Sequence, residues 1–183
     1  MPRLHPIPVE QTRAHLEPGP VVLLSTAHRG TRGIMTLGWH MMLGYDLVGT
    51  YIWAANASHA LARGSRECVI NVPGEDLLDT VVRIGNCSSA EADKFERFGL
   101  TAVEGSAVDA PGIGECHARF ECELHETRIT ADYPLFVWRV RAAHAVKRPR
   151  WPSTVHYRGD GVFKIGERNV SRRRLFRPDM LES

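Results

Sequence analysis

Apolar and polar residues alternate along several short stretches of the chain, and turn residues separate these stretches. The clearest period of two runs from residue 115 to residue 125, where every second side chain is apolar or a cysteine. Such alternation predicts a strand with one buried face. Further strands are predicted at Val21–Thr26, Leu47–Ala55, Glu67–Val72, Leu135–Val146 and Gly161–Ile165, and at 35–43, where Met35, Leu37, Trp39, Met41 and Leu43 are expected to form one apolar face.

The helices predicted between these strands are few and short. One begins near Asn56 or Ser58, either of which suits a helix cap, and ends near Gly64. A second follows Pro73-Gly74 and ends near Gly85, and a third covers residues 90–98. Many short strands with few helices favour an antiparallel barrel with peripheral helices over a doubly wound sheet. We therefore expect a mainly β fold.

Length and charge narrow the organisation of the chain and its partners. With 183 residues and 43% hydrophobic content, residues 1–183 are expected to form a single domain. The 23 basic and 21 acidic residues leave a formal net charge of +2, which gives no reason to expect a nucleic-acid partner or a membrane surface. No apolar run reaches the ~20 residues of a membrane span, and the first residues lack the apolar core of a secretory signal. A cytoplasmic protein is expected.

The cysteines and histidines do not indicate a metal site. Cys68, Cys87, Cys116 and Cys122 show no Cys-x-x-Cys spacing, which argues against a zinc ribbon or a disulfide framework. In the strand at 115–125 the cysteines fall on the apolar face and the histidines on the polar face, so they are badly placed to share a metal. Cys87, in a polar loop, is the cysteine expected to react most readily, but an inert thiol fits its surroundings better because no base adjoins it in sequence.

Common catalytic motifs are absent from the sequence. There is no Gly-x-Gly-x-x-Gly after a strand, no phosphate-binding loop, no Gly-x-Ser-x-Gly elbow and no His-Glu-x-x-His. Candidate chemistry is therefore confined to three short polar stretches. In the first, Met35-Thr36-Leu37-Gly38-Trp39-His40, backbone groups beside Gly38 would reach a planar ligand such as the pyrimidine edge of a flavin. An ordinary amphipathic strand has the same pattern.

The other two stretches suit phosphate and hydroxyl groups. Asn56-Ala57-Ser58-His59, at a helix start, would offer free backbone N–H groups, a hydroxyl and a partly protonated His59, which would make phosphate binding depend on pH. A plain helix cap uses the same residue types. Gly85-Asn86-Cys87-Ser88-Ser89, followed by Asp93-Lys94, would bind a ribityl chain or a phosphate, or would form a solvated turn. The Arg172-Arg173-Arg174 run suits a solvated tail.

Five blocks in this order resemble the flavin reductase-like, FMN-binding split-barrel family, which includes flavoredoxin and the reductase components of two-component monooxygenases. The blocks are Met35–Met42, Asn56–His59, Glu67–Pro73, Gly85–Ser89 and Asp93–Leu100, with a weaker echo at His156–Phe163. The resemblance covers residues 18–168, between an N-terminal extension and the arginine-rich tail. It implies an antiparallel split β-barrel with a few peripheral helices.

The resemblance also implies a function and a set of site residues. FMN would bind in a homodimer, with the flavin near the subunit interface, and NADH or NADPH would donate electrons that pass to a monooxygenase or another acceptor protein. A non-catalytic FMN electron-transfer protein and a barrel without flavin are the alternatives. No catalytic acid–base side chain and no metal ligand are expected. The cofactor-binding residues implied are Met35, Thr36, Leu37, Gly38, Trp39 and His40 at the ring, and Asn56, Ser58, His59, Asn86, Ser88, Ser89 and Lys94 at the ribityl phosphate.

Overall fold

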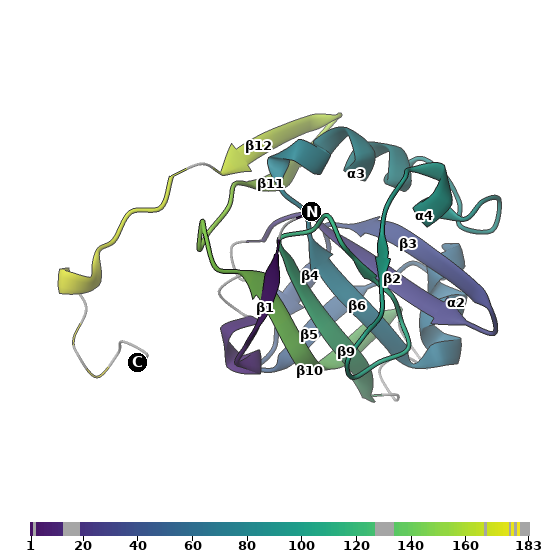
Figure 1. Ribbon diagram of the computed structural model, residues 1–183, viewed down its shortest axis with the longest axis horizontal. Helices are drawn as coiled ribbons and strands as arrows, with labels where there is room; N and C mark the ends of the chain where they lie inside the picture. Colours follow the sequence, from purple (N-terminus) through teal and green to yellow (C-terminus); the bar gives the residue numbers. More distant parts are fainter. Residues whose placement is uncertain are drawn as a thin grey trace.

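One antiparallel sheet organises the protein in the computed structural model (Figure 1). The structure describes residues 1, 3–12, 19–126, 134–166, 168–175, 177 and 179, so the boundary expected at residue 18 lies outside the described residues. The main strands and helices are β1 (Leu4–Ile7), β2 (Val22–His28), β3 (Thr31–Leu37), β4 (His40–Met42), β5 (Leu47–Tyr51), α2 (Ala57–Ser65), β6 (Glu67–Val72), α3 (Leu78–Gly85), α4 (Lys94–Arg97), β9 (Ala118–Glu126) and β10 (Leu135–Val146). Smaller elements are η1 (Val9–Gln11), η2 (Glu75–Leu77), β7 (Ala102–Val103), β8 (Gly112–Ile113), β11 (Thr154–Gly159), β12 (Val162–Gly166) and η3 (Arg173–Leu175).

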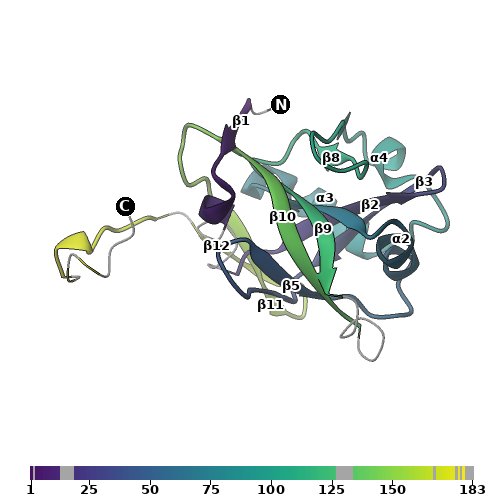
Figure 2. The same ribbon diagram turned by 90° about the horizontal axis from the view of Figure 1, so that it is seen from below.

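The sheet curls into a half-barrel. Its strands follow the order β3-β2-β6-β9-β10-β5-β4, so β3 and β4 are the two edge strands although only residues 38 and 39 separate them in sequence. The long strand β10 pairs with β5 along its first half and with β1 along its second (Figure 2). The open seam between β3 and β4 makes this a split barrel. The predicted mainly β, antiparallel split-barrel fold with few helices is confirmed.

The single strand predicted at 35–43 is wrong in its continuity and in its buried face. The chain leaves β3 after Leu37, which is buried, and enters β4 at His40. Beyond this break Trp39, Met41 and Leu43 point outward, with exposed fractions of 72%, 56% and 47%. The side chains do alternate with a period of two, but β4 lies at the opposite edge of the sheet from β3. Its apolar side therefore faces outward.

Apolar side chains pack on both faces of the curled sheet. Inside the barrel the core includes Leu24, Phe120 and Trp138, and the Trp138 indole donates to the Thr50 hydroxyl at 2.8 Å. Alternate residues of the same strands face outward, where Leu23 packs with α3, α4 and the β11–β12 hairpin. This second layer holds α3 against β3, on the side where the pocket described below opens. In the described part of the chain, no helix is long and apolar enough to cross a membrane.

Strand β9 confirms the predicted apolar face but corrects the opposite one. Ala118, Phe120, Cys122 and Leu124 are buried on one face of β9, as expected, whereas Cys116 precedes the strand and is buried in the outer cluster that contains Leu23. On the face predicted to be wet, however, His117 and Glu121 are also buried. The reason for Glu121 is a loop that folds over it, because its carboxylate accepts from the backbone N–H groups of Ser106 and Ala107 at 2.8 and 2.6 Å.

Two other expectations need correction. The helix predicted at 90–98 is limited to Lys94–Arg97, because the Asp93 carboxylate caps it by accepting from the backbone N–H groups of Phe95 and Glu96. The last predicted strand, near residue 162, pairs with β11, which periodicity did not indicate. Two residues of the arginine run, Arg173 and Arg174, fall in η3, which lies away from the barrel in both views (Figures 1 and 2).

Candidate functional site

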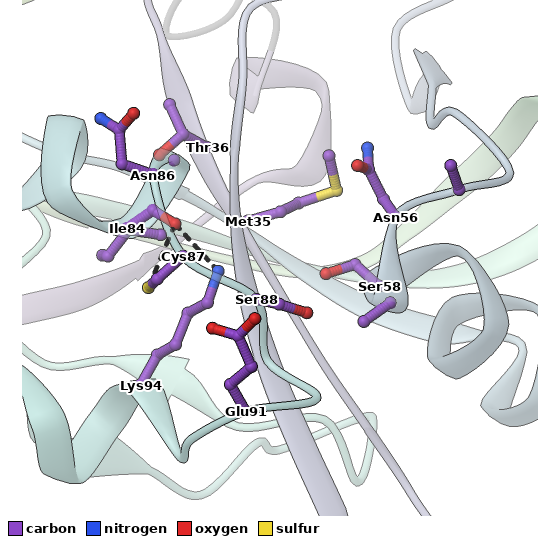
Figure 3. Close-up of a pocket in the computed structure, with 13 residues that line it drawn as sticks. Met35, Thr36, Asn56, Ser58, Ile84, Asn86, Cys87, Ser88, Glu91 and Lys94 are labelled. Atoms are coloured by element: carbon purple, nitrogen blue, oxygen red, sulfur yellow. Dashed lines mark hydrogen bonds between the residues drawn. The ribbon is translucent and has the colours of Figure 1, made fainter.

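A pocket of about 450 Å³ opens between β3, the start of α2 and the segment that follows α3 (Figure 3). This volume lies within the range of about 300–1,000 Å³ that is usual for small-molecule sites. Seven of the residues predicted from sequence line it: Met35, Thr36, Asn56, Ser58, Asn86, Ser88 and Lys94. The other lining residues are Ala55, Ala57, Ile84, Gly85, Cys87 and Glu91.

The outer edge of β3 borders this pocket. Ile34 uses that edge to bond Ser89, because its N–H donates to Ser89 Oγ and the Ser89 hydroxyl donates to its carbonyl oxygen, both at 3.3 Å. In an antiparallel strand the backbone groups of alternate residues point the same way, so those of Thr36 also point away from β2. Within the described residues β3 has no strand neighbour on that side. Thr36 therefore offers one backbone donor and one acceptor to the pocket.

The first turn of α2 forms the opposite wall. Asn56 is the N-cap residue by position, but its side chain makes no capping hydrogen bond. The first backbone N–H groups of a helix have no partner within the helix, and here they belong to Ala57 and Ser58, which both line the pocket. These N–H groups and the positive end of the helix dipole suit an anion.

Polar side chains of the third wall satisfy the carboxyl end of α3. The last carbonyl groups of a helix lack intrahelical donors. Thr36 Oγ1 donates to the carbonyl oxygen of residue 81 at 2.6 Å, Asn86 Nδ2 to that of residue 82 at 2.8 Å, and Lys94 Nζ to that of residue 84 at 2.9 Å. These three side chains thus hold α3 in place beside the pocket. The Ser88 hydroxyl accepts from Ala90 N at 3.2 Å and keeps its own proton available.

Lys94 is the cation of the pocket, and its charge is partly compensated. Its side chain is buried, and burial lowers the pKa of its ammonium group, while the nearby Cys87 and Glu91 act to raise it. Cys87 Sγ also donates to the Ile84 carbonyl, at 3.7 Å. Figure 3 shows both groups directed at this one oxygen. Cys87 is the one cysteine of the four that is not buried.

Six residues predicted for the site do not line the pocket. Leu37 is part of the barrel core, and Ser89 is occupied by Ile34. Trp39 is exposed at the seam, where Gly38 has open space around its Cα. The remaining two, His40 and His59, are held by other contacts. His40 Nε2 donates to the Pro20 carbonyl at 2.7 Å, and burial lowers the pKa of His40 although this bond opposes the shift.

His59 lies beside Phe136. The two rings make an edge-to-face contact with centroids 5.3 Å apart. Burial, and then the charge of Arg63, lower the pKa of His59. Its ring is therefore directed at the barrel rather than at the pocket.

Sequence reasoning missed Glu91 as a pocket residue. It was placed in a helix at 90–98, but residue 91 lies in a turn closed by a hydrogen bond from Glu91 N to Ser88 O of 3.2 Å. A signal was present in the sequence, because Asp93 is a strong helix cap and a helix that starts after it leaves Glu91 in the preceding loop.

Comparisons with known proteins agree with this architecture. A family model described as "Flavin reductase like domain" matches residues 14–164. An uncharacterized protein of Archaeoglobus fulgidus is 35% identical over 109 residues, which are 58% of this chain and 62% of that protein. The match thus spans less than two thirds of the length of this relative.

Solved structures share the fold at low sequence identity. An FMN-binding domain of a flavin reductases-like enzyme from Shewanella baltica superposes with a TM-score of 0.85 at 22% identity, covering 93% of this chain and 97% of that one. Flavoredoxin of Desulfovibrio vulgaris gives 0.76 at 18%, covering 85% and 90%. Nitrilotriacetate monooxygenase component B of Bacillus cereus gives 0.70 at 16%, covering 88% and 91%. The family model covers most of the chain, and the chain belongs to the flavin reductase-like domain family.

Proposed function

We propose that the pocket binds FMN and that the protein is an oxidoreductase in which NADH or NADPH reduces this flavin, which then passes electrons to a second acceptor. One observation carries the proposal. The unpaired backbone edge at Thr36 and the uncapped start of α2 face a single pocket of about 450 Å³. A ligand that fits this pocket would have a planar group whose donor and acceptor atoms pair with Thr36. Its other end would be an anion that binds at the start of α2.

The residues of the pocket fit the parts of FMN. The N–H and C=O of Thr36 would pair with the pyrimidine edge of the ring, as neighbouring strands pair. The hydroxyls of Ser58 and Ser88 and the amide of Asn56 would bond the ribityl chain. The backbone N–H groups of Ala57 and Ser58 would hold the phosphate.

The flavin would supply the redox chemistry when bound, by accepting a hydride at its N5 atom and passing electrons on. The protein positions the ring and shields it. No histidine lines the pocket among the described residues, and its ionisable side chains are Cys87, Glu91 and Lys94. The chain therefore contributes binding and orientation, and we assign no side chain to acid–base catalysis.

Two alternatives differ in the electron donor and in the cofactor. A flavoredoxin-like protein would bind FMN but take electrons from a protein, and a barrel that has lost flavin would bind none. The acceptor is proposed to be a monooxygenase or another protein, by analogy with the monooxygenase component B among the structural relatives. We also propose a cytoplasmic location, in keeping with four free cysteine thiols.

A homodimer is part of the proposal. Six large apolar side chains are exposed on β4, on the residues next to it, and at and just after the end of β5: Trp39, Met41, Leu43, Tyr45, Tyr51 and Trp53. We call these six residues the aromatic face. Trp53 lies three residues before Asn56, whose N–H donates to the Trp53 carbonyl at 2.9 Å. A second copy packed on the aromatic face would adjoin the pocket.

The absorption spectrum tests the proposal. The protein purified with FMN and freed of excess flavin should keep the visible band of oxidised flavin. Anaerobic addition of NADH or NADPH should then bleach this band. A protein that retains flavin but is bleached by neither nucleotide is the electron-transfer alternative, and one that retains no flavin at all contradicts FMN binding.

Two substitutions at one position test the role of the β3 edge. Thr36→Pro removes the outward N–H, and an edge strand tolerates proline where the N–H faces away from the ladder. Thr36→Val keeps this N–H but removes the hydroxyl that bonds the carbonyl of residue 81. We expect Thr36→Pro to weaken FMN binding by about tenfold, the worth of one hydrogen bond of ~1.4 kcal/mol, and Thr36→Val to weaken it less. Equal losses in titrations monitored by flavin fluorescence would argue against pairing at this edge.

A further inference from the structure

We propose that Glu91 weakens the binding of the flavin phosphate and so sets how strongly the protein prefers FMN over riboflavin. This role rests on the flavin site of the proposed function. Glu91 lines the pocket from an exposed turn at its rim. Its carboxylate points into the pocket in Figure 3, toward Lys94 and Ser88, and Ser58, at the start of α2 where the phosphate is proposed to bind, lies on the opposite wall.

The charges of the lining residues nearly cancel. Among the described residues that line the pocket, Lys94 is the only cation and Glu91 is the only carboxylate. A phosphate dianion therefore gains little from the side-chain charges taken together. What favours it is the start of α2, a nine-residue helix with no side-chain cap.

Lys94 is poorly placed to offset Glu91. Its ammonium group donates to the carbonyl of Ile84, at the negative end of α3, and its side chain is only 4% exposed. Burial lowers the pKa of this ammonium, and the carboxylate of Glu91 acts to raise it. The ammonium group of Lys94 is therefore held at the end of α3, and it offsets the charge of Glu91 only in part.

The rim position of Glu91 gives its charge a selective effect. A carboxylate repels the phosphate of FMN, whereas riboflavin has no charge at that end. For charges separated by several ångströms near a wet surface, the repulsion corresponds to a change in affinity of about threefold to tenfold at low salt. A contact between Glu91 and the ribityl hydroxyls, by contrast, would affect both flavins equally.

The test compares two flavins on matched variants. The dissociation constants of FMN and riboflavin are measured on the wild type, Glu91→Gln and Glu91→Lys by fluorescence titration at low ionic strength. We expect Glu91→Gln to tighten FMN by about threefold to tenfold and Glu91→Lys to tighten it further. Riboflavin should change by less than about twofold, and about 0.5 M salt should reduce the effect on FMN.

Glu104→Gln is the control for a change in net charge, because Glu104 is exposed and does not line the pocket. It should leave both affinities as in the wild type. If Glu91→Gln shifts both flavins equally, or shifts neither, the role of Glu91 is refuted while the flavin site stands. If the wild type binds neither flavin, the proposed function itself fails, and the role of Glu91 fails with it.

Discussion

At the scale of single residues, packing decides which polar groups remain available to a ligand. His59 stands next to Ser58, at the start of α2, where a protonated imidazole would attract phosphate. Its ring instead packs edge-on against Phe136, and burial followed by the charge of Arg63 lowers its pKa. Both effects favour the neutral form of the ring. His59 then contributes to the seating of α2 on the barrel rather than to anion binding.

Replacing His59 by glutamine tests this assignment. We expect the FMN dissociation constants of the wild type and of His59→Gln to agree within about twofold from about pH 5.5 to about pH 8, because the ring packs against Phe136 and does not line the pocket. Both proteins should share any trend caused by ionisation of the phosphate itself near pH ~6. A gap that widens as the pH falls would show that protonated His59 binds the phosphate.

The ordered sequence blocks predicted which residues surround the pocket better than they predicted what those residues bond. Ser58 and Ser88 line the pocket, where the resemblance placed them, although their residue types alone fitted a helix cap or a solvated turn as well. Thr36 and Asn86 also line it, but their side chains bond the end of α3. That outcome depends on where α3 lies in space, which no local pattern records. Glu91 was missed for a related reason, since its place depends on where α4 begins.

At the scale of elements, one ion pair and one cap fix the short helix α4 that carries Lys94. Asp93 accepts from Phe95 N at 2.8 Å and from Arg32 Nε at 2.6 Å. Burial acts to raise the pKa of Asp93, but these donors outweigh it, and the pKa lies below its usual value. Because Arg32 belongs to β3, the same carboxylate ties α4 to the strand that borders the pocket.

Substitutions of Asp93 should destabilise the fold in a pH-dependent way. Asp93→Ala is expected to lower the free energy of unfolding by about 1–2 kcal/mol, the worth of a cap plus a partly exposed ion pair, and Asp93→Asn by less because an amide oxygen still accepts at the cap. Since the folded pKa is depressed, the contribution is complete above the ordinary value of 3.8 and is lost as the pH falls through the folded pKa. Urea unfolding at neutral and acidic pH measures the free energies of unfolding of the wild type and the two variants. A difference between wild type and Asp93→Asn that persists in acid would contradict it.

Element boundaries were predictable where a turn residue marks them. Strand β6 and the start of α2 lie where apolar runs and a capping residue placed them. The break between β3 and β4 was not predictable from alternation, because the period of two continues through it. Only closure of the sheet, which brings Leu37 and Met41 to opposite edges, reveals that their apolar side chains face different environments.

At the scale of the whole molecule, incomplete closure leaves one edge strand with an apolar outer side. The side chains of Met41 and Leu43 pack over Gly49. A Cβ added at Gly49 would lie 3.4 Å from Met41 Cγ and 3.2 Å from Leu43 Cδ1. Beside them the rings of Trp39 and Tyr51 lie 5.4 Å apart, and Trp53 is 64% exposed. Contiguous apolar surface of this kind marks an interaction site on a folded protein. A stable dimer needs about 1,000 Å² or more of buried surface, and the aromatic face is proposed as its centre.

A charge placed on the aromatic face should therefore have two effects: it should dissociate the dimer, and it should weaken the binding of FMN. Sedimentation at micromolar concentration is expected to show a dimer for the wild type and a monomer for Trp53→Glu, because a buried unpaired carboxylate opposes association. Tyr157→Glu is the matched control, since Tyr157 is 57% exposed on the β11–β12 hairpin and is not one of the six residues of the aromatic face. Trp53→Glu should also raise the FMN dissociation constant, since the Trp53 carbonyl holds Asn56 at the pocket and the partner would support this turn. A wild type that sediments as a monomer would contradict the proposed dimer. A Trp53→Glu variant that remains a dimer would show that the subunit contact lies elsewhere.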